Sequence, residues 1–412
     1  MKTTPVKGTA DYLPSQSRLR DYLQGIILDT YRAAGFERVM TPAIEDMENL
    51  DKSDGGDNLN LMFKIMKRGE KLDAALAAGN FDDLADLGLR YDLTLPLSRF
   101  YAANRAKLSS PFKCIQIDKA YRAERPQKGR MREFVQCDID ILGSDSPLCE
   151  LELIHTTAAA LLKLDIGRFT IKVNDRRVLR GVLHSAGVAE EQMGTVCVSL
   201  DKWDKIGTEG VLAELSEKEI APEAVEAIGK LLESGCTLEQ AEALCGDPES
   251  IARLKGILRD SEALAAGRYD VAFDLLLIRG QGYYTGTVFE IQSNKFRGSV
   301  AGGGRYDGLI GKFTGEDVPA VGFSIGFERI FQILESQGFS IPGKARRIAV
   351  LCNEGEGVAA VSKAEELRAD GAEVSVYIRP KKMGKFLSRL QEQGFDAFLV
   401  LGESEEPKPL AQ

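Results

Sequence analysis

The sequence predicts an α+β domain that carries a helical insertion and is followed by a small α/β domain with parallel strands. Five strand-like runs predict the sheet of the first domain, at 112–118, 133–142, 168–174, 270–278 and 285–293. The stretch 207–266 is dominated by Glu, Ala, Leu and Lys at helical spacing and predicts the insertion. From 346 onward, the strand-like runs RIAVLC, EVSVYI and DAFLVL alternate with helical segments, which is typical of a parallel sheet.

The length of the chain fits this division. Its 412 residues are enough for two or three domains of about 100–200 residues each. Hydrophobic residues make up 44% and charged residues 28%, a globular composition that excludes disorder. We expect a core over 1–335 with its insertion at about 175–266, a linker over 336–345, and a second domain over 346–412 that is shortened after its third strand.

Composition also bears on location. The chain has no run of about 18 apolar residues, so we expect no membrane-spanning helix. The opening MKTTPVKGTADYLPS lacks the apolar segment of a secretory signal. The seven cysteines are scattered, with no C-x-x-C pair, which suits reduced thiols. We therefore expect a cytoplasmic protein.

Local patterns define the first elements of the core. Apolar residues at helical spacing over 19–31, with Gly35 as a C-cap, predict a helix. The segment 37–44 reads as a strand, and Pro42 places it at an edge or an interface because proline cannot donate to a sheet ladder. Residues 70–88, rich in Ala, Leu and Asp, predict a short helical insert.

Charge and histidine content restrict the chemistry. The net charge of −9 excludes a basic field over the whole protein, although local basic patches remain possible. The two histidines, His155 and His184, are far apart in sequence and exclude a zinc site built from several histidines. Any acyl or phosphoryl chemistry must rest mainly on arginines, carboxylates and backbone groups.

The densest cluster of cations is YRAERPQKGRMREF, over 121–134. Its basic residues are Arg122, Arg125, Lys128, Arg130 and Arg132. A guanidinium group forms two parallel hydrogen bonds with a phosphate group and also stacks on aromatic rings. The simpler interpretation is a solvated charged loop. Strand-like runs on both sides predict a hairpin instead, in which a base stacks on Phe134 while phosphates lie on the arginines.

A second constellation is RGQGYYTG, which begins at Arg279 directly after the apolar run VAFDLLLI. A lone arginine in such a place needs an acidic partner or a ligand, so an interface salt bridge is the alternative. The glycines allow close approach of a ligand to the backbone, and Tyr283 and Tyr284 offer a wall with polar tips.

A third constellation combines GGGRYDG, over 302–308, with GFSIGFER, over 322–329. Glycine-rich segments alone are weak evidence, because most are tight turns. The ending Gly-Phe-Glu-Arg is more specific, since it places Arg329 near the start of a helix, where an anion is favoured.

The fourth constellation is RYDLT, over 90–94, together with two polar residues further along the chain. Asp92, Thr94, Gln136 and Asp140 are able to line one polar pocket. Read singly, each is also an ordinary surface or capping residue.

These clusters, in this order, resemble the class II aminoacyl-tRNA synthetases, and specifically the histidyl-tRNA synthetase family. Pro42, the segment from Arg122 to Phe134, and the segment from Gly322 to Arg329 are similar to the three motifs shared by class II enzymes. RYDLT, QCDID, RG-x-x-YYTGT and GGRYDG resemble the signals specific for histidine. The resemblance covers nearly the whole chain and implies an antiparallel catalytic sheet. Where the family usually has Leu-Asp, this chain has Gln281 and Gly282.

The resemblance also implies roles for single residues. Arg122 and Arg279 would be catalytic and reach the α-phosphate of ATP from opposite sides. The remaining ATP-binding residues would be Glu124 at the adenine edge, Phe134 and Arg329 around the base, and Arg130 and Arg132 at the outer phosphates. The histidine-binding residues would be Asp92, Thr94, Gln136, Asp140, Arg279, Tyr283, Tyr284 and Tyr306.

The implied reaction is that of a histidine--tRNA ligase, with L-histidine, ATP and tRNA(His) as partners, Mg²⁺ on the leaving pyrophosphate, and no metal ligand named. The resemblance further implies a homodimer through the Pro42 region and an anticodon-binding-like second domain. A second candidate is the histidine-sensing regulatory subunit of ATP phosphoribosyltransferase, which has this fold without catalysis. The changes at Gln281 and Gly282 favour it, whereas a complete set of ATP-binding residues favours the ligase.

Overall fold

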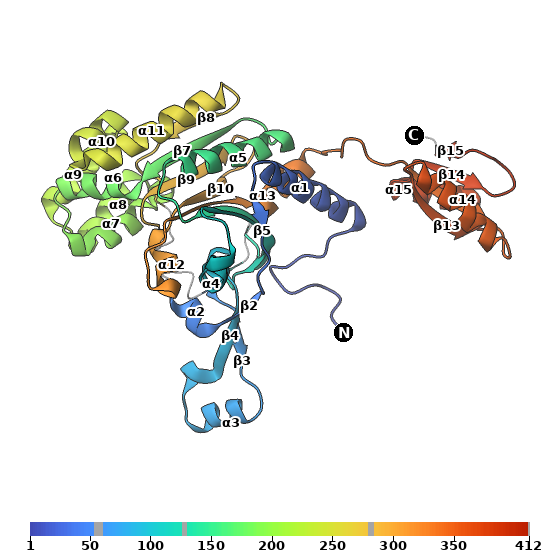
Figure 1. Cartoon of the computed structure of the whole chain (residues 1–412), viewed down its shortest axis with the longest axis horizontal. Helices are drawn as coiled ribbons and strands as arrows, with labels where there is room; N and C mark the ends of the chain where they lie inside the picture. The colour runs from blue at the N-terminus through green and yellow to red at the C-terminus, as the bar shows by residue number, and fades with distance from the viewer. Residues whose placement is uncertain (53–60, 126–129, 279–283, 411–412) are drawn as a thin grey trace. The chain divides into compact units, whose positions relative to one another are not determined.

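The structure, a computed structural model, describes residues 1–52, 61–125, 130–278 and 284–410. The chain divides into two compact units, Met1–Phe339 and Ser340–Gln412 (Figure 1).

In the described part of the first unit, eight strands form one sheet in the order β1-β5-β6-β11-β10-β9-β7-β8. The strands are β1 Glu37–Arg38, β5 Phe112–Tyr121, β6 Glu133–Leu142, β7 Phe169–Asp175, β8 Asp270–Phe273, β9 Thr287–Ser293, β10 Ser299–Arg305 and β11 Ala320–Gly326. Neighbours are antiparallel except at the two edges, where β1 pairs with β5 and β7 pairs with β8 in parallel. The predicted α+β class and its largely antiparallel sheet are confirmed.

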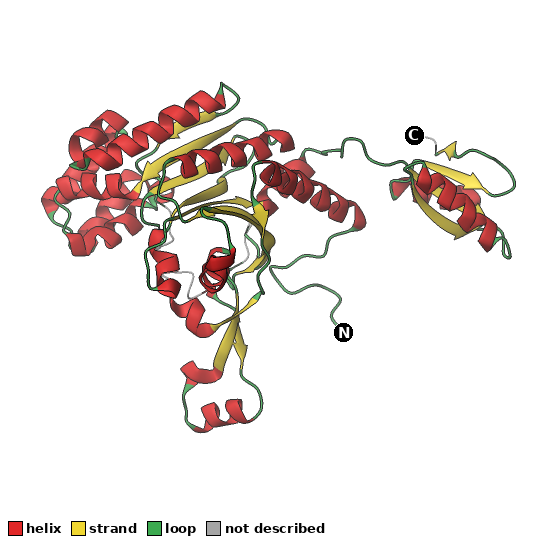
Figure 2. Ribbon diagram, in the orientation of Figure 1, coloured by secondary structure: helices red, strands yellow, loops and turns green. Residues whose placement is uncertain are grey.

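One face of this sheet is covered by three helices, α1 Pro14–Ala33, α5 Leu148–Leu164 and α13 Phe327–Ser336 (Figures 1 and 2). Alternate residues of β6 are buried beneath them, including Cys137 and Ile139. Because side chains alternate across a strand, the residues between them face the other side. On that side lie α4 Thr94–Asn104 and α12 Asp307–Thr314, which pack against each other.

The helical insertion lies between β7 and β8. Its helices are α6 Arg176–Ser185, α7 Met193–Leu200, α8 Trp203–Glu217, α9 Pro222–Ser234, α10 Leu238–Cys245 and α11 Pro248–Ala265. They gather beyond one end of the sheet, in green and yellow in Figure 1, and α11 packs against α5. The insertion and the eight-stranded sheet therefore belong to one compact unit.

The structure corrects the helical prediction for 70–88. A helix, α3 Glu70–Ala77, is present, but Ala85–Leu89 is a strand, β4. It is the central strand of a small sheet with β2 Ile44–Asp46 and β3 Lys64–Met66. Hydrogen bonding on both sides outweighs the weak strand propensity of Ala-Asp-Leu-Gly-Leu. The strand expected over 37–44 is likewise two short strands, β1 and β2.

The glycines of 302–304 form no turn, because they lie inside β10. A Cβ atom on Gly303 would lie 2.0 Å from the carbonyl oxygen of Gly322, and one on Gly304 would lie 2.7 Å from that of Thr287. The neighbouring strands approach too closely for any larger residue, which is the usual reason for glycine within a strand.

The second unit contains the predicted parallel strands, β12 Arg347–Cys352, β13 Glu373–Ile378 and β14 Ala397–Val400, with helices α14 Gly357–Ala369 and α15 Met383–Glu392. A fourth strand, β15 Lys408–Pro409, pairs antiparallel with β14 and extends the sheet beyond the third strand that we expected to be last. None of the helices described in either unit is long and apolar enough to cross a membrane.

Candidate active site

The basic cluster lies at the end of a hairpin formed by β5 and β6, which pair up to Tyr121 and Glu133. Arg122 leaves β5 at this point, and its Nε donates to the carbonyl oxygen of Tyr91 at 3.1 Å. Its guanidinium lies 5.2 Å from the centre of the Phe134 ring. The cation and the aromatic ring that the sequence placed at a nucleotide site are therefore neighbours.

Two further arginines converge on Glu124. Arg130 donates to its carboxylate at 3.1 Å, and the Nε of Arg132 donates to its carbonyl oxygen at 3.1 Å. Arg130 is exposed and Arg132 half-buried, so both side chains border solvent. Glu124 thus fixes the positions of both arginine side chains at the end of the hairpin.

A cluster of buried acidic residues, which we call the acidic pocket, lies on the sheet face opposite α1 and α13. Gln136, Asp138 and Asp140 alternate along β6 and so share this face. Asp140 accepts a hydrogen bond from the Tyr306 hydroxyl at 2.7 Å. Asp92, from the segment before α4, accepts one from the backbone N–H of Leu95 at 3.1 Å. The three carboxylates are each at most 3% exposed.

Burial sets the electrostatics of this pocket. It raises the pKa of Asp140 to about 7, against the hydrogen bond from Tyr306, and the charge of Asp92 adds to the rise. The pKa of Asp138 lies well above its usual range through burial and the charge of Asp140. Burial also raises the pKa of Asp92, which Arg122 partly opposes. Buried like charges with raised pKa values are typical of functional sites.

Glycines on the neighbouring strands make room for these carboxylates. A Cβ atom on Gly322 would lie 1.9 Å from the Oδ1 of Asp140. One on Gly304 would lie 2.9 Å from the ring of Tyr284. The glycine-rich strands β10 and β11 therefore form a floor beside the polar residues of β6.

The start of α13 is fixed against the same strand. Glu328 accepts from the backbone N–H of Val135 at 3.1 Å and forms a two-pronged ion pair with Arg20 of α1, at 2.6 and 2.8 Å. The next residue, Arg329, donates to the carbonyl oxygen of Ser299. Arg329 follows the start of the helix, as predicted from the sequence.

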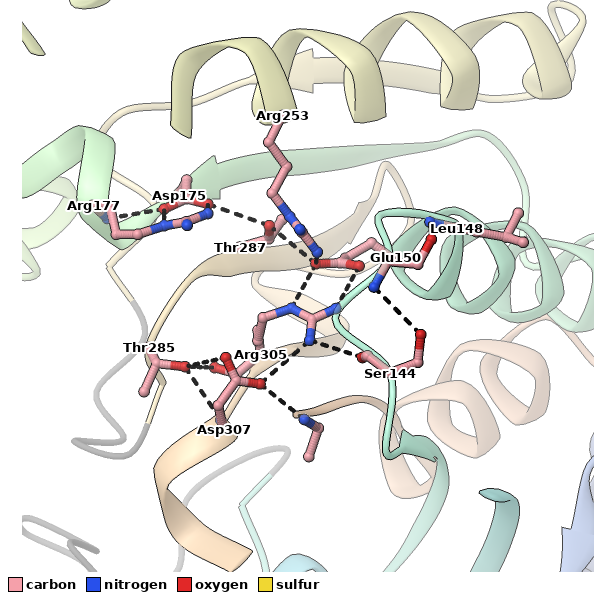
Figure 3. A network of polar contacts seen from close by, with 12 residues as sticks. Ser144, Leu148, Glu150, Asp175, Arg177, Arg253, Thr285, Thr287, Arg305 and Asp307 are labelled. Carbon is pink, nitrogen blue, oxygen red and sulfur yellow. Dashed lines mark hydrogen bonds and ion pairs between the residues drawn. The ribbon is translucent and has the colours of Figure 1, made fainter. Parts of the chain in front are cut away.

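A second buried network is centred on Glu150 of α5 (Figure 3). Arg305 donates to both Glu150 oxygens at 2.9 and 2.8 Å, and Arg253 from α11 donates at 2.7 Å. Arg305 also donates to Asp307 at 3.3 Å. Burial alone would raise the pKa of Glu150, but its arginine partners lower it below the usual range.

The structure thus brings together most of the predicted site residues. Arg122, Glu124, Arg130, Arg132 and Phe134 share the hairpin, whereas Asp92, Thr94, Gln136, Asp140 and Tyr306 lie around the acidic pocket with Tyr284 at its glycine floor. Arg279 and Tyr283 lie outside the described residues. Sequence reasoning missed Asp138, although its alternation with Gln136 and Asp140 was a signal, and missed the Arg20–Glu328 pair, which no local pattern reveals.

A metal site built from side chains finds no support within the described ranges, which hold no group of three or more His, Cys, Asp or Glu residues placed to bind an ion.

Comparisons with known proteins agree with this geometry. The family model for histidyl-tRNA synthetase matches residues 8–330. A histidine--tRNA ligase from Leifsonia xyli is 42% identical over 96% of this chain and 94% of its own length. The crystal structure of histidyl-tRNA synthetase from Nostoc is 27% identical, with a TM-score of 0.79 over 97% of this chain and 91% of that one. The fold is that of a class II aminoacyl-tRNA synthetase. Within that class, the chain belongs to the histidyl-tRNA synthetase family.

A second solved structure supports the fold alone. It is described as an ATP phosphoribosyltransferase regulatory subunit/histidyl-tRNA synthetase from Bacillus halodurans, is 20% identical, and has a TM-score of 0.79 over 97% of this chain and 98% of that one.

Proposed function

We propose that the described pocket and hairpin carry out the reaction of a histidine--tRNA ligase, which activates L-histidine with ATP and transfers histidine to tRNA(His). One observation carries the proposal. The Arg122 guanidinium lies 5.2 Å from the centre of the Phe134 ring, and its Nε donates to the carbonyl oxygen of Tyr91, the residue before Asp92, so that the nucleotide residues and the amino-acid pocket adjoin each other.

The chemistry of activation suits this arrangement. The carboxylate of histidine is already ionised at neutral pH, since its pKa is about 3.5. It needs no general base to attack the α-phosphorus, so the scarcity of histidines is no obstacle. It needs alignment, and positive charge where the transition state gathers negative charge. Arg122 supplies that charge from the hairpin. The matching role of Arg279 rests on the family resemblance.

ATP would lie along the hairpin. Its adenine would stack on Phe134 with Arg329 on the other side, and Glu124 would read the edge of the base. Arg130 and Arg132, which already border solvent, would meet the outer phosphates. Mg²⁺ would accompany the phosphates of ATP and offset their negative charge, and we assign no step to it.

The amino acid would enter the acidic pocket. Asp92, Thr94, Gln136 and Asp140 would surround it, with the tyrosines of the two histidine-specific segments, Tyr283, Tyr284 and Tyr306. A pocket that pairs both imidazole nitrogens leaves its own polar groups unpaired when another side chain enters, and such sites reject analogues by about 10⁴-fold or more.

The remaining partners follow from the family. The second unit would bind the anticodon side of tRNA(His), with the basic stretch 379–385 as a candidate contact. The Pro42 region would form a homodimer interface, where Met40 and Ile44 are exposed apolar side chains. A cytoplasmic location fits a translation enzyme.

The test is histidine-dependent exchange between ATP and pyrophosphate. We expect exchange with L-histidine and with no other amino acid. The alternative, a histidine-sensing regulatory subunit of ATP phosphoribosyltransferase, would show no exchange but would bind a phosphoribosyltransferase in a histidine-dependent way. Curated relatives at 42% and 36% identity carry ligase names, which supports the ligase.

A further inference from the structure

Four oxygen atoms in the acidic pocket have no hydrogen-bond partner among the residues that the structure describes. They are Oδ2 of Asp92, Oε1 of Gln136, Oδ1 of Asp138 and Oδ2 of Asp140, all with almost no exposure to solvent. Buried polar atoms are normally paired, and a group of unpaired acceptors indicates a ligand that supplies donors. Asp138 belongs to this set, although neither the sequence motifs nor the proposed function gives it a role.

The residues opposite Asp138 are Gln116 on β5 and Ser324 on β11. The Ser324 hydroxyl hydrogen-bonds to the Asp138 carboxyl group, but Oδ1 keeps no partner among the described residues. Gln116 donates to the carbonyl oxygen of Leu93 at 2.8 Å and accepts from Thr41 at 3.2 Å. The amide of Gln136 donates to the other carboxylate oxygen, Oδ2, at 3.4 Å. The side chain of Asp138 therefore keeps one unpaired oxygen, Oδ1, on the same face of the sheet as Asp140.

The charges around Asp138 are mainly negative. Asp140 from its own strand and Asp92 from the segment before α4 disfavour its ionised form, whereas Ser324 from β11 and Arg122 from the hairpin favour it. Burial raises the pKa values of the Cys114 thiol on β5 and the Tyr31 hydroxyl on α1, and the charge of Asp138 adds to both rises. An electropositive donor is what this environment lacks, and an ammonium group is such a donor.

We propose that Asp138 is a further histidine-binding residue, whose Oδ1 accepts an N–H of the bound amino acid beside Asp92, Gln136 and Asp140. The inference rests on the proposed function and deepens it. Histidine with a neutral ring offers four N–H donors, three on its ammonium group and one on the imidazole, and the pocket offers four unpaired acceptors.

A residue that serves the ligand differs from one that serves the fold. A buried carboxylate without a partner destabilises the folded chain. Replacing Asp138 by its neutral isostere should therefore leave the unfolding temperature unchanged or raise it, while histidine binding becomes weaker. If Asp138 only supported the sheet, its replacement would lower both the unfolding temperature and the affinity for histidine.

The experiment is calorimetric titration of the full-length chain with L-histidine, combined with thermal unfolding of the same samples. We expect Asp138→Asn to weaken binding by about tenfold or more, because a charge-assisted hydrogen bond is replaced by a neutral one. Asp29→Asn makes the same change on an exposed residue of α1, whose side chain is 79% exposed, and should bind histidine as the wild type does.

Wild-type affinity in Asp138→Asn would overturn the inference and leave the ligase assignment standing. Weaker binding accompanied by a lower unfolding temperature would also overturn it, because the role would then be structural. A wild-type chain that binds no histidine at all would overturn the proposed function first, and this inference with it.

Discussion

The first unit contains two buried acidic sites, Glu150 in one and Asp138 with Asp140 in the other, which differ in their hydrogen-bond partners. Glu150 is paired on both oxygens by Arg305 and Arg253, and its pKa is lowered. Asp138 and Asp140 each keep one oxygen unpaired among the described residues, and their pKa values are raised. Both sites are almost inaccessible to solvent, so burial alone does not explain the difference.

The difference separates structure from function. Arg253 comes from the insertion, Glu150 from α5 and Arg305 from the sheet, so the paired network fastens three parts of the unit together (Figure 3). Asp138 and Asp140 each keep one buried oxygen without a partner among the described residues, and such an oxygen costs stability that a ligand restores. Strain of this kind is commonly found at functional sites.

Breaking the paired network should have the largest effect. Glu150→Gln leaves the partly buried Arg253 without its countercharge and the buried Arg305 with Asp307 alone, and we expect a loss of about 3–5 kcal/mol in the free energy of unfolding. Urea unfolding measures this loss. Glu226→Gln removes an exposed pair with Lys230 and should leave the unfolding midpoint unchanged. Equal midpoints for the two variants would refute the structural role of Glu150.

Removing Arg122, the cation near the Asp92 carboxylate, should instead abolish most of the exchange activity. We expect Arg122→Ala to reduce histidine-dependent ATP–pyrophosphate exchange by at least about 10²-fold, the effect of one lost transition-state donor. Arg168→Ala, which removes an exposed arginine paired with Asp270, is the matched control and should exchange normally. Near-normal exchange in Arg122→Ala would remove its assigned role.

The glycine floor gives a smaller test. The Cβ of Gly322→Ala would lie 1.9 Å from Asp140, so the carboxylate must move. We expect histidine affinity to fall by about tenfold, as for a lost charge-assisted hydrogen bond. A Cβ on Gly308 would meet no atom within 4 Å, so Gly308→Ala should bind histidine normally. Unchanged affinity in both variants would show that Asp140 is not held where histidine binds.

The smallest expected effect is a shift in pH dependence. Asp140 accepts an N–H more strongly when it is ionised, so histidine binding should strengthen as the pH rises through about 7. The hydrogen bond from Tyr306 lowers this pKa, so Tyr306→Phe should move the transition upward, by about one pH unit or less. The ring of free histidine titrates equally in both experiments. A downward shift, measured by calorimetry from pH 5.5 to 8.5, would contradict the assignment.

The same raised pKa has a consequence for stability. An acid whose pKa rises on folding stabilises the folded chain below its unfolded pKa and loses that contribution as the pH rises through the folded value. The unfolding temperature of Asp140→Asn should therefore fall less between pH 5 and 8 than that of the wild type. Parallel curves would show that Asp140 titrates normally.

Much of this fold was predictable from periodicity. The hairpin around Arg122, the helix that contains Arg329 and the parallel strands after 346 follow from local apolar spacing. The strand Ala85–Leu89 was not predictable, because its pairing partners β2 and β3 decide its conformation. The same applies to Gly303, where the close approach of another strand, and not a turn, requires glycine.

The site shows the same division. The pattern of one polar residue in every two along β6 was sufficient to include Asp138 with Gln136 and Asp140. The pairs Arg20–Glu328 and Arg305–Glu150 join residues far apart in sequence, and only the tertiary structure reveals them.

A crystal structure of the chain with bound L-histidine tests the central claim most directly. We expect nitrogen atoms of histidine to lie within hydrogen-bond distance of the oxygens now unpaired on Asp92, Asp138 and Asp140. The ion pairs of Glu150 should be unchanged. Histidine bound elsewhere, or carboxylates turned toward protein donors, would contradict it.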